Sequence, residues 1–257
     1  MNFLSHAPSL NNGDSLTELT LKDKQRYDRQ IIMKDWGEET QEKIKDTTAL
    51  IAGVGGLGSP VSVYLAAAGI GEIRLVDNDT VELSNLNRQV LYKEKQVGKS
   101  KVKSAKKSLQ ELNTDIEITA LNKEINKKTI DTLSKDADLI IDCMDNYKTR
   151  YVLNKASQKR EIPLFHAAVE GMQGQATTII PNETPCIKCI FPNSPPSEKF
   201  PVVGATPGLL GTIQVHEVLK YVTGQGDLLT NQLLLVRNGT EFEKIEVQKD
   251  PDCEVCQ

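Results

Sequence analysis

The sequence has no apolar run that approaches the roughly 18 to 20 residues of a membrane-spanning helix. It also has little net charge: the formal value is -4 over 257 residues, which gives no general attraction to nucleic acid or to an anionic membrane. Residues 1–16 lack the basic start and the apolar stretch of a secretory signal peptide. We therefore expect a cytoplasmic protein that binds neither a membrane nor nucleic acid.

The composition is that of a globular protein, with 39% apolar and 26% charged residues, which is enough to bury a core. The length allows one large domain or two small ones, and the sequence contains no internal repeat. Residues 1–20 are polar, and we expect them to form a flexible N-terminal tail. Patterns of helices and strands then continue through residues 21–257, which we interpret as a single domain.

Short apolar runs alternate with helical patterns over most of the chain. Strands are expected at 47–54, 72–77, 115–121, 137–143 and 162–169, and helices at 21–46, 59–68, 99–112, 147–159 and 208–221. This alternation predicts an α/β fold with a Rossmann-like, mostly parallel sheet flanked by helices. Residues 233–236 and 242–247 indicate a hairpin around Asn238-Gly239, and hence a C-terminal antiparallel extension.

A glycine-rich turn follows the first expected strand. Gly53, Gly55 and Gly58 form a Gly-x-Gly-x-x-Gly pattern that also includes Gly56, and a small-residue helix follows. Asp77 lies 19 residues after Gly58 at the end of the second expected strand, where a carboxylate accepts hydrogen bonds from ribose hydroxyls. The alternative is a turn that only packs the helix on the strand. Because turn, helix, strand and Asp77 are in register, we favour a nucleotide site.

The residues that come next favour a polyphosphate over NAD. Arg88 and Lys101 would lie near the nucleotide, and cations suit a site where phosphate charge grows during the reaction. Asp145 follows a buried strand, where a carboxylate facing a triphosphate would hold Mg²⁺. Each residue has an ordinary alternative: a surface ion pair for Arg88, a solvated lysine-rich helix face for Lys101, and a helix N-cap for Asp145-Asn146.

Taken together and in order, these motifs resemble the MoeB/ThiF/HesA group of adenylyltransferases, which are related to ubiquitin-activating enzyme. The matching stretches are Arg26-Tyr-Asp-Arg29-Gln30, Gly53-Val-Gly-Gly-Leu-Gly58, Asp77-Asn-Asp79, Ser84-Asn-Leu-Asn-Arg88-Gln89, Gly98-x-x-Lys101 and Asp142-Cys-Met-Asp145-Asn146. The resemblance covers about residues 22–257, nearly the whole chain, and the ordered set is far more specific than the glycine turn alone.

The resemblance implies that the nucleotide is ATP. Members of the group activate the C-terminal glycine carboxylate of a small ubiquitin-like sulfur-carrier protein: the carboxylate attacks the α-phosphate, pyrophosphate leaves and an acyl-adenylate remains. It therefore implies a carrier ending in Gly-Gly, a homodimer, and a separate sulfurtransferase as the source of sulfur. Molybdopterin biosynthesis, thiamine biosynthesis and modification of tRNA or protein are all open as the pathway.

The same resemblance assigns residues to the nucleotide. Residues implied to bind ATP are Gly53, Gly55, Gly56, Gly58, Asp77, Asp79, Asn85, Arg88, Gln89, Lys101, Asp145 and Asn146. Within this set, Gly55 lies in the phosphate loop and Asp77 binds the ribose.

The implied catalytic residues are all charged. Arg88 and Lys101, together with Asn85, contact the phosphates, and Asp145 orients Mg²⁺. Arg29 reaches the phosphates from the other subunit of the homodimer, a role suited to a permanently charged planar donor. From the sequence alone, without the resemblance, we would favour an ion pair on a helix surface for Arg29.

Four of the five cysteines form two Cys-x-x-Cys pairs, which in a cytosolic chain favour a metal over a disulfide. Cys186, Cys189, Cys253 and Cys256 would give a closed tetrahedral Zn²⁺ site, which is structural because no position stays open for water. Since 63 residues separate the pairs, the fold must bring them together. The site would tie the loop 181–207, which holds seven of the eleven prolines, to the C-terminus. Two unrelated pairs or redox thiols are the alternatives.

One feature departs from several relatives, which carry a further cysteine in the loop after the first zinc pair. Residues 191–204 contain none, and the unpaired Cys143 lies in an expected buried strand, where it would pack as a small hydrophobic residue. We therefore expect adenylation without a thioester or persulfide step. His166 and His216 are interpreted as structural.

Two other functions remain open from the sequence. An NAD-dependent oxidoreductase would explain the glycine turn, but it leaves Arg29, Arg88, Lys101 and the four cysteines without a shared purpose. A non-catalytic scaffold that binds a ubiquitin-like protein would keep the fold and lose the chemistry. The intact set of charged residues counts against that second alternative.

Overall fold

The structure is a computed structural model of the full chain, and it describes residues 16–193 and 200–256. Most of the expected flexible tail, and part of the proline-rich loop, therefore lie outside the described residues. The division into a tail and a single domain stays a prediction. In the described ranges, no helix combines the length and the apolar character that crossing a membrane requires.

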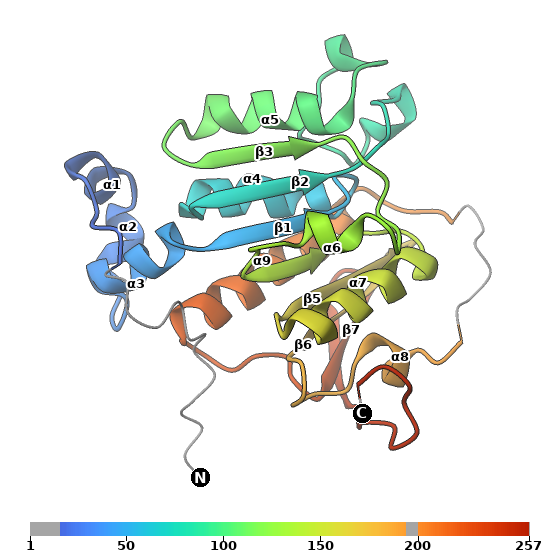
Figure 1. The fold of residues 1–257 in the computed structure, drawn as a ribbon. Coiled ribbons are helices and arrows are strands. Elements are labelled where there is room, and N and C mark those ends of the chain that lie inside the picture. Colours follow the sequence, from blue (N-terminus) through green and yellow to red (C-terminus); the bar gives the residue numbers. More distant parts are fainter. Residues whose placement is uncertain (1–15, 194–199, 257) are drawn as a thin grey trace.

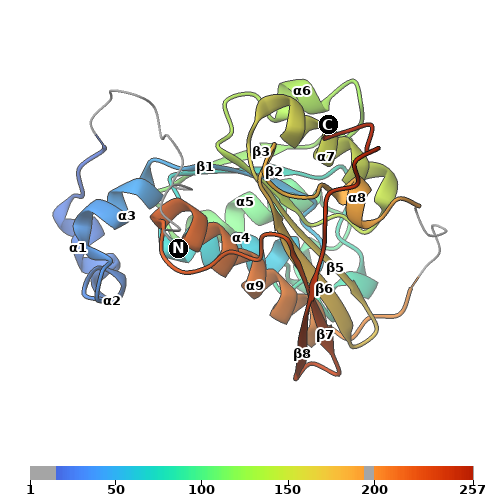
Figure 2. The ribbon, with the colours of Figure 1, turned by 90° about the horizontal axis from the view of Figure 1, so that it is seen from below.

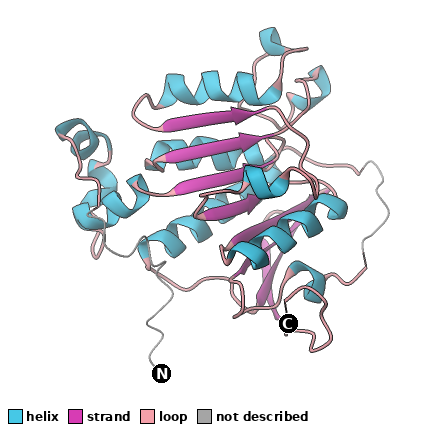
Figure 3. Cartoon of the chain, viewed as in Figure 1, coloured by secondary structure: helices cyan, strands magenta, loops and turns pink. Residues whose placement is uncertain are grey.

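Among the described residues, eight strands form one sheet in the order β3-β2-β1-β4-β5-β6-β7-β8 (Figure 1, Figure 3). The strands are β1 Thr48–Ala52, β2 Glu72–Val76, β3 Glu117–Leu121, β4 Leu139–Asp142, β5 Leu164–Glu170, β6 Gln173–Ile179, β7 Gln232–Arg237 and β8 Glu241–Glu246. The first five are parallel to one another, and β6, β7 and β8 add an antiparallel extension. The predicted fold class is confirmed.

Helices cover both faces of the parallel part of the sheet (Figure 2). One face carries α4 Gly58–Ala68, α5 Lys101–Leu112 and α9 Ala205–Thr223, and the other carries α6 Ile130–Leu133, α7 Tyr147–Arg160 and α8 Ile187–Ile190. Successive side chains of a strand point to opposite faces. Ala49 and Ile51 of β1 accordingly pack in the core on the α4 side, while Leu50 and Ala52 pack in the core on the α7 side. Burial on both faces explains the continuous apolar runs of the parallel strands.

The expected helix over residues 21–46 is wrong in its continuity. The structure has three short helices there, α1 Leu21–Arg26, α2 Asp28–Ile31 and α3 Gly37–Lys45. Two residues between the end of α2 and the start of α3 are in the left-handed region: Asp35 has φ 64°, and Gly37, the first residue of α3, has φ 71°. Such a conformation cannot continue a right-handed helix.

The antiparallel extension is also larger than expected. Strand β6 was not predicted, and it pairs with all seven residues of β5 across a turn that contains Gly171 at φ 60°. Its sequence, QGQATTI, has no clean alternation of apolar and polar residues. Helix α9 begins at Ala205, before the expected start at residue 208, because Pro207 falls in its first turn, where proline is tolerated.

The order of the strands locates the ligand edge. Strand β1 lies between β2 and β4, so the connections from β1 and β4 run to opposite sides. Open α/β sheets bind ligands at such a point, beyond the carboxyl ends of the strands.

Candidate active site

The chain leaves β1 through a turn that only glycine fits. Gly53 has φ +90°, and a Cβ there would come within 2.8 Å of the carbonyl oxygen of Cys143. A Cβ at Gly58 would lie 2.1 Å from the carbonyl oxygen of Gly53. These close approaches bring the first residue of α4 to the carboxyl edge of the sheet. The helix start offers free backbone N–H groups there, and its dipole favours an anion.

Asp77, just past β2, is held in place by two backbone donors. The N–H of Val54 donates to Oδ2 at 2.9 Å, and the N–H of Asp79 donates to Oδ1 at 2.8 Å. A carboxylate has about four acceptor sites, so capacity remains for ribose hydroxyls. Tyr92 supports the same turn by donating its hydroxyl to the carbonyl oxygen of Val54 at 2.7 Å. Burial, together with the charges of Asp77 and Asp79, raises the pKa of Tyr92 far above its usual value, so the phenol stays a donor.

A cavity of about 930 Å³ opens beside the glycine turn, a volume near the upper end of the range typical of ligand pockets. Ten of the residues assigned to the nucleotide line it: Gly53, Gly55, Gly56, Asp77, Asp79, Arg88, Gln89, Lys101, Asp145 and Asn146. The fold therefore brings together residues from five separate stretches of the sequence.

Two assigned nucleotide residues do not line this cavity. Gly58 contributes indirectly, because its lack of a side chain lets α4 approach the turn. The side-chain oxygen of Asn85 accepts the N–H of Glu82 at 3.1 Å and closes a short 3-10 turn, η1 Leu83–Asn85. Ser84 and Asn87, its neighbours, line the cavity instead. A phosphate contact from Asn85 stays a prediction.

Lys101 does not belong to a solvated lysine face. It is the first residue of α5, is only 6% exposed, and its Nζ lies 2.8 Å from Oδ2 of Asp79. Lys103, two residues on, is exposed. Because an ammonium group has three N–H donors, Lys101 keeps donors for a ligand in the cavity.

Arg88 is held without a carboxylate partner among the described residues. Its Nη1 donates to the carbonyl oxygen of Ser84 at 3.0 Å and to Oδ1 of Asn87 at 2.9 Å. These neutral acceptors orient the guanidinium at the cavity and leave its charge uncompensated. The surface ion pair that the sequence left open is absent from residues 16–193 and 200–256.

Gln89 is a buried residue at the wall of the cavity. It is 3% exposed and lines the cavity, yet its side-chain oxygen has no hydrogen-bond partner in the described part of the chain. A buried polar atom without a partner costs about 1–3 kcal/mol.

The acidic end of the cavity follows β4. Asn146 accepts the N–H of Thr149 at 2.9 Å and so caps α7, which confirms the N-cap alternative for this residue. Asp145 is exposed, lines the cavity and accepts Nδ2 of Asn146 at 3.2 Å. Asp145 is therefore available to a cation, and Mg²⁺ is bound in proteins by one or two carboxylates together with substrate phosphates.

Sequence reasoning missed the rest of the lining. It includes Val76, Lys123, Glu124, Ile125, Met144, Arg150, Val169, Phe200, Val202 and Pro207. Most carry no local motif, because the loop after β3 and the segment before α9 reach the cavity only through the fold. Val76, Ile125 and Met144 provide apolar surface of the kind that a purine ring packs on. Arg150 did carry a signal: it lies in the first turn of a helix, where the dipole disfavours a cation.

The four paired cysteines come together away from the cavity, on the α8 side. Their Sγ atoms all lie within 4.8 Å of one another, with separations of 3.9 Å (Cys186–Cys189), 3.7 Å (Cys186–Cys253) and 3.4 Å (Cys189–Cys256). Zn–S bonds of about 2.3 Å in a tetrahedron place the sulfurs about 3.8 Å apart. The cluster could therefore hold a zinc ion, and it joins the loop after β6 to the end of the described chain. These separations are too long for disulfides.

Cys143 packs as expected. It is 7% exposed, and burial raises the pKa of its thiol well above the usual value. A buried thiol of this kind stays protonated and is a poor nucleophile.

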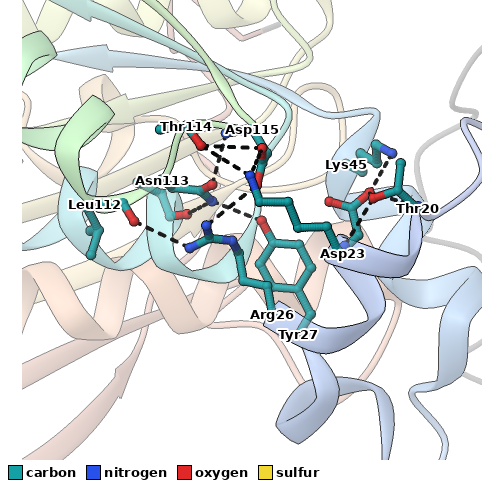
Figure 4. A network of polar contacts seen from close by, with 11 residues as sticks. Thr20, Asp23, Arg26, Tyr27, Lys45, Leu112, Asn113, Thr114 and Asp115 are labelled. Carbon is teal, nitrogen blue, oxygen red and sulfur yellow. Dashed lines mark hydrogen bonds and ion pairs between the residues drawn. The ribbon is translucent and has the colours of Figure 1, made fainter.

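The first helix is fastened to the body of the protein by a polar network (Figure 4). The Tyr27 hydroxyl accepts Nδ2 of Asn113 at 2.9 Å, and the Tyr27 ring lies against Gly69, where a Cβ would come within 2.5 Å of it. Arg26 Nη2 lies 3.5 Å from Oδ2 of Asp115. Tyr27 is 4% exposed, so this network fixes the junction of α1 and α2.

Arg29 follows that junction, on α2, and is exposed. Helices α1 and α2 lie at the amino ends of the parallel strands, whereas the cavity lies at their carboxyl ends (Figure 1). Arg29 therefore does not reach the cavity of its own chain. The ion pair on a helix surface is also absent, because no carboxylate in the described ranges pairs with it.

Comparison with known sequences gives the family. The ThiF family model matches residues 27–255. Protein HesA of heterocysts from Trichormus variabilis is 39% identical over 244 residues, which cover 94% of this chain and 91% of that protein. The adenylyltransferase and sulfurtransferase MOCS3 of Drosophila persimilis is 39% identical over 248 residues, covering 93% of this chain and 55% of that protein.

Solved structures agree with the sequence relatives. E. coli MccB crystallised with MccA-N7isoASN superposes with a TM-score of 0.81 at 25% identity, covering 91% of this chain and 74% of MccB. E. coli MccB crystallised with ATP gives a TM-score of 0.75 at 26% identity, covering 85% of this chain and 68% of MccB. With the cavity and its charged residues, these likenesses place the chain in the ThiF family, and it is an adenylyltransferase.

Proposed function

We propose that this protein adenylates the C-terminal glycine carboxylate of a small ubiquitin-like sulfur-carrier protein with ATP and releases pyrophosphate. The observation that carries the proposal is the meeting of Arg88, Lys101 and Asp145 with the glycine turn in one cavity. A nicotinamide site would need a flat apolar slot where these charges lie. The relatives support the choice, because MOCS3 is named an adenylyltransferase and MccB has been crystallised with ATP.

The reaction needs positioning and charge stabilisation more than a nucleophilic side chain. A carboxylate oxygen of the carrier attacks the α-phosphorus, the bond from that phosphorus to the bridging oxygen breaks, and pyrophosphate leaves with the electron pair. Negative charge accumulates on the phosphates as this happens. Lys101 and Arg88 would stabilise it by charge-assisted hydrogen bonds, while Asp77 holds the ribose.

Mg²⁺ fits the acidic end of the cavity, because Asp145 offers carboxylate oxygens beside the expected phosphates. When bound, the ion would neutralise phosphate charge and orient the leaving group. Asn146 would help by donating to Asp145, as it already does at 3.2 Å.

A homodimer completes the proposal. Arg29 is exposed, unpaired within the described residues and at the opposite end of the strands from its own cavity. Its guanidinium would serve the cavity of a second copy, and the network around Tyr27 would hold it in place. The four cysteines would carry a structural Zn²⁺ ion, and sulfur would be delivered by a separate sulfurtransferase.

ATP–pyrophosphate exchange tests the proposal. Purified protein with Mg²⁺ and labelled pyrophosphate is assayed with each small ubiquitin-like protein of the same organism that ends in Gly-Gly. We expect exchange that depends on one carrier and is lost in Asp145→Ala. This result would name the carrier and so separate molybdopterin, thiamine and thiolation pathways. Absence of exchange with every carrier, from zinc-loaded protein, would leave a nucleotide-binding scaffold as the better account.

A further inference from the structure

Three buried ionisable side chains form a group next to the cavity. Asp142 ends β4, His166 lies in β5, and Arg150 lies in the first turn of α7; they are 0%, 1% and 5% exposed. Nδ1 of His166 lies 2.7 Å from Oδ2 of Asp142, and Nε of Arg150 lies 3.6 Å from the same oxygen. Of the three, only Arg150 lines the cavity.

This group holds both main-chain polar groups of Met144, the residue before Asp145. The N–H of Met144 donates to Oδ1 of Asp142 at 3.1 Å. Nη2 of Arg150 donates to the carbonyl oxygen of Met144 at 2.6 Å and, over a longer distance of 3.4 Å, to that of Ala167 in β5. On the other side of Asp145, the side chain of Asn146 is fixed as the cap of α7. Asp145 therefore lies between two residues that cannot easily move.

Stability of the helix does not explain Arg150. A cation in the first turn opposes the helix dipole, and burying a charged side chain is costly unless it is fully paired. Nε of Arg150 has no hydrogen-bond partner among the described residues, and the guanidinium lies 4.8 Å from the centre of the Tyr147 ring. Burying the guanidinium at this position therefore costs free energy. We relate it to the hydrogen bond that Arg150 makes with the Met144 carbonyl.

We infer that Arg150, anchored on Asp142, is a positioning residue that fixes the turn 144–146 and thereby aims the Asp145 carboxylate at the metal and phosphates of the bound nucleotide. The inference rests on the proposed function for its consequence, because Asp145 matters only if a nucleotide binds. The clamp itself is a property of the chain and is measurable without substrate.

His166 completes the anchor. Burial lowers its pKa, although the contact with Asp142 opposes this, so the ring is neutral and donates from Nδ1 to the carboxylate. The Asp142 carboxylate thus accepts hydrogen bonds from the Met144 N–H and from His166. Its negative charge is compensated by the positive charge of Arg150. Nε2 of His166 has no partner in the described part of the chain, so the ring acts through Asp142 alone.

Hydrogen exchange of the peptide that spans residues 143–147 tests the clamp. Arg150→Met is compared with wild type and with Arg74→Met, a control in which the lost arginine also pairs with a carboxylate, Glu72, and donates to a main-chain carbonyl, but does not line the cavity. We expect Arg150→Met to speed exchange in this peptide by about tenfold or more under conditions where Arg74→Met leaves it unchanged. Unchanged protection in Arg150→Met would overturn the inference.

The consequence for Asp145 is tested by ATP affinity with and without Mg²⁺, measured by calorimetry on Asp145→Ala, Arg150→Met and the double variant. The ratio of the two affinities for wild type should be in the range of about 5–150-fold. In each single variant, the ratio of ATP affinity with Mg²⁺ to ATP affinity without it should fall most of the way to one. In the double variant it should fall no further. Two results would contradict positioning through Asp145. One is an unchanged ratio in Arg150→Met, and the other is a loss in the double variant that equals the product of the losses in the two single variants. If wild type binds no ATP, the proposed function fails, while hydrogen exchange still decides the clamp.

Discussion

At the scale of single residues, Lys101 and Lys103 show how the fold separates a site from a surface. Both belong to the lysine-rich helix α5, but Lys101 is buried against Asp79 at the cavity and Lys103 is exposed. We expect Lys101→Met to lower carrier-dependent pyrophosphate exchange by about 100-fold, the usual cost of removing one preorganised donor from a developing anion. Lys103→Met should stay within about twofold of wild type. Equal losses in the two variants would place the lysine effect outside the cavity.

A site residue can be predicted from the sequence when the residues next to it in the sequence indicate its role. Gly53 and Gly58 are constrained by positive φ or by contact with nearby backbone, so the sequence pattern states their role. Ile125 and Phe200 line the same cavity only because distant segments converge on it, and nothing adjacent to them in sequence indicates this. Gln89 was predicted from its motif, and the structure adds its unpaired buried oxygen.

At the scale of elements, Glu72 joins three parallel strands at their amino ends. It accepts from Arg74, Thr119 and Thr48, and these partners, Arg74 foremost, outweigh burial and lower its pKa. A lowered folded-state pKa gives stability that is present above the unfolded value near 4.5 and is lost as pH falls through the folded value. Glu72→Gln should therefore be less stable than wild type at pH 7, by an amount that shrinks as the pH falls below about 4. Denaturant unfolding of both proteins at pH 7 and at a pH below about 4 measures this difference in the free energy of unfolding. A difference that stays constant, or that grows as the pH falls, would contradict the prediction.

The cysteine cluster is an element that a metal would stabilise. We expect about one zinc per chain in wild type and its loss in Cys253→Ser, together with a Tm lower by roughly 4–8 °C if about 2 kcal/mol is lost in a chain of this size. Cys143→Ala is the control, because it removes a buried thiol outside the cluster and should retain the zinc. Elemental analysis after dialysis against a chelator, with thermal unfolding, gives both readouts. Full zinc retention in Cys253→Ser would remove the proposed site.

Elements differ in how well local sequence predicts them. The inner parallel strands were expected because burial on both faces makes them nearly continuously apolar, as in β1, TALIA. Strand β6 was missed because five of its seven residues are polar or glycine, so the strand depends on its pairing with β5. The break between α2 and α3 contains Asp35, whose left-handed conformation has only a weak local signal in the sequence.

At the scale of the whole molecule, the separation of Arg29 from its own cavity predicts complementation between subunits. Arg29→Ala and Lys101→Met should each be nearly inactive alone. In a co-expressed dimer that holds one of each, the cavity with intact Lys101 would receive the intact Arg29 of its partner. Random pairing should therefore restore about a quarter of wild-type exchange. Activity no higher than the sum of the single variants would show that Arg29 does not act across a dimer.

The central claim is that the product is a carrier adenylated at its terminal glycine. The most direct measurement is the intact mass of the candidate carrier after incubation with protein, ATP and Mg²⁺, with pyrophosphatase added to pull the reaction forward. We predict a mass gain of one AMP, located on the C-terminal glycine, that is absent with Asp145→Ala and absent when the carrier lacks its final glycine. A carrier that binds the protein and ATP but keeps its original mass would contradict the account.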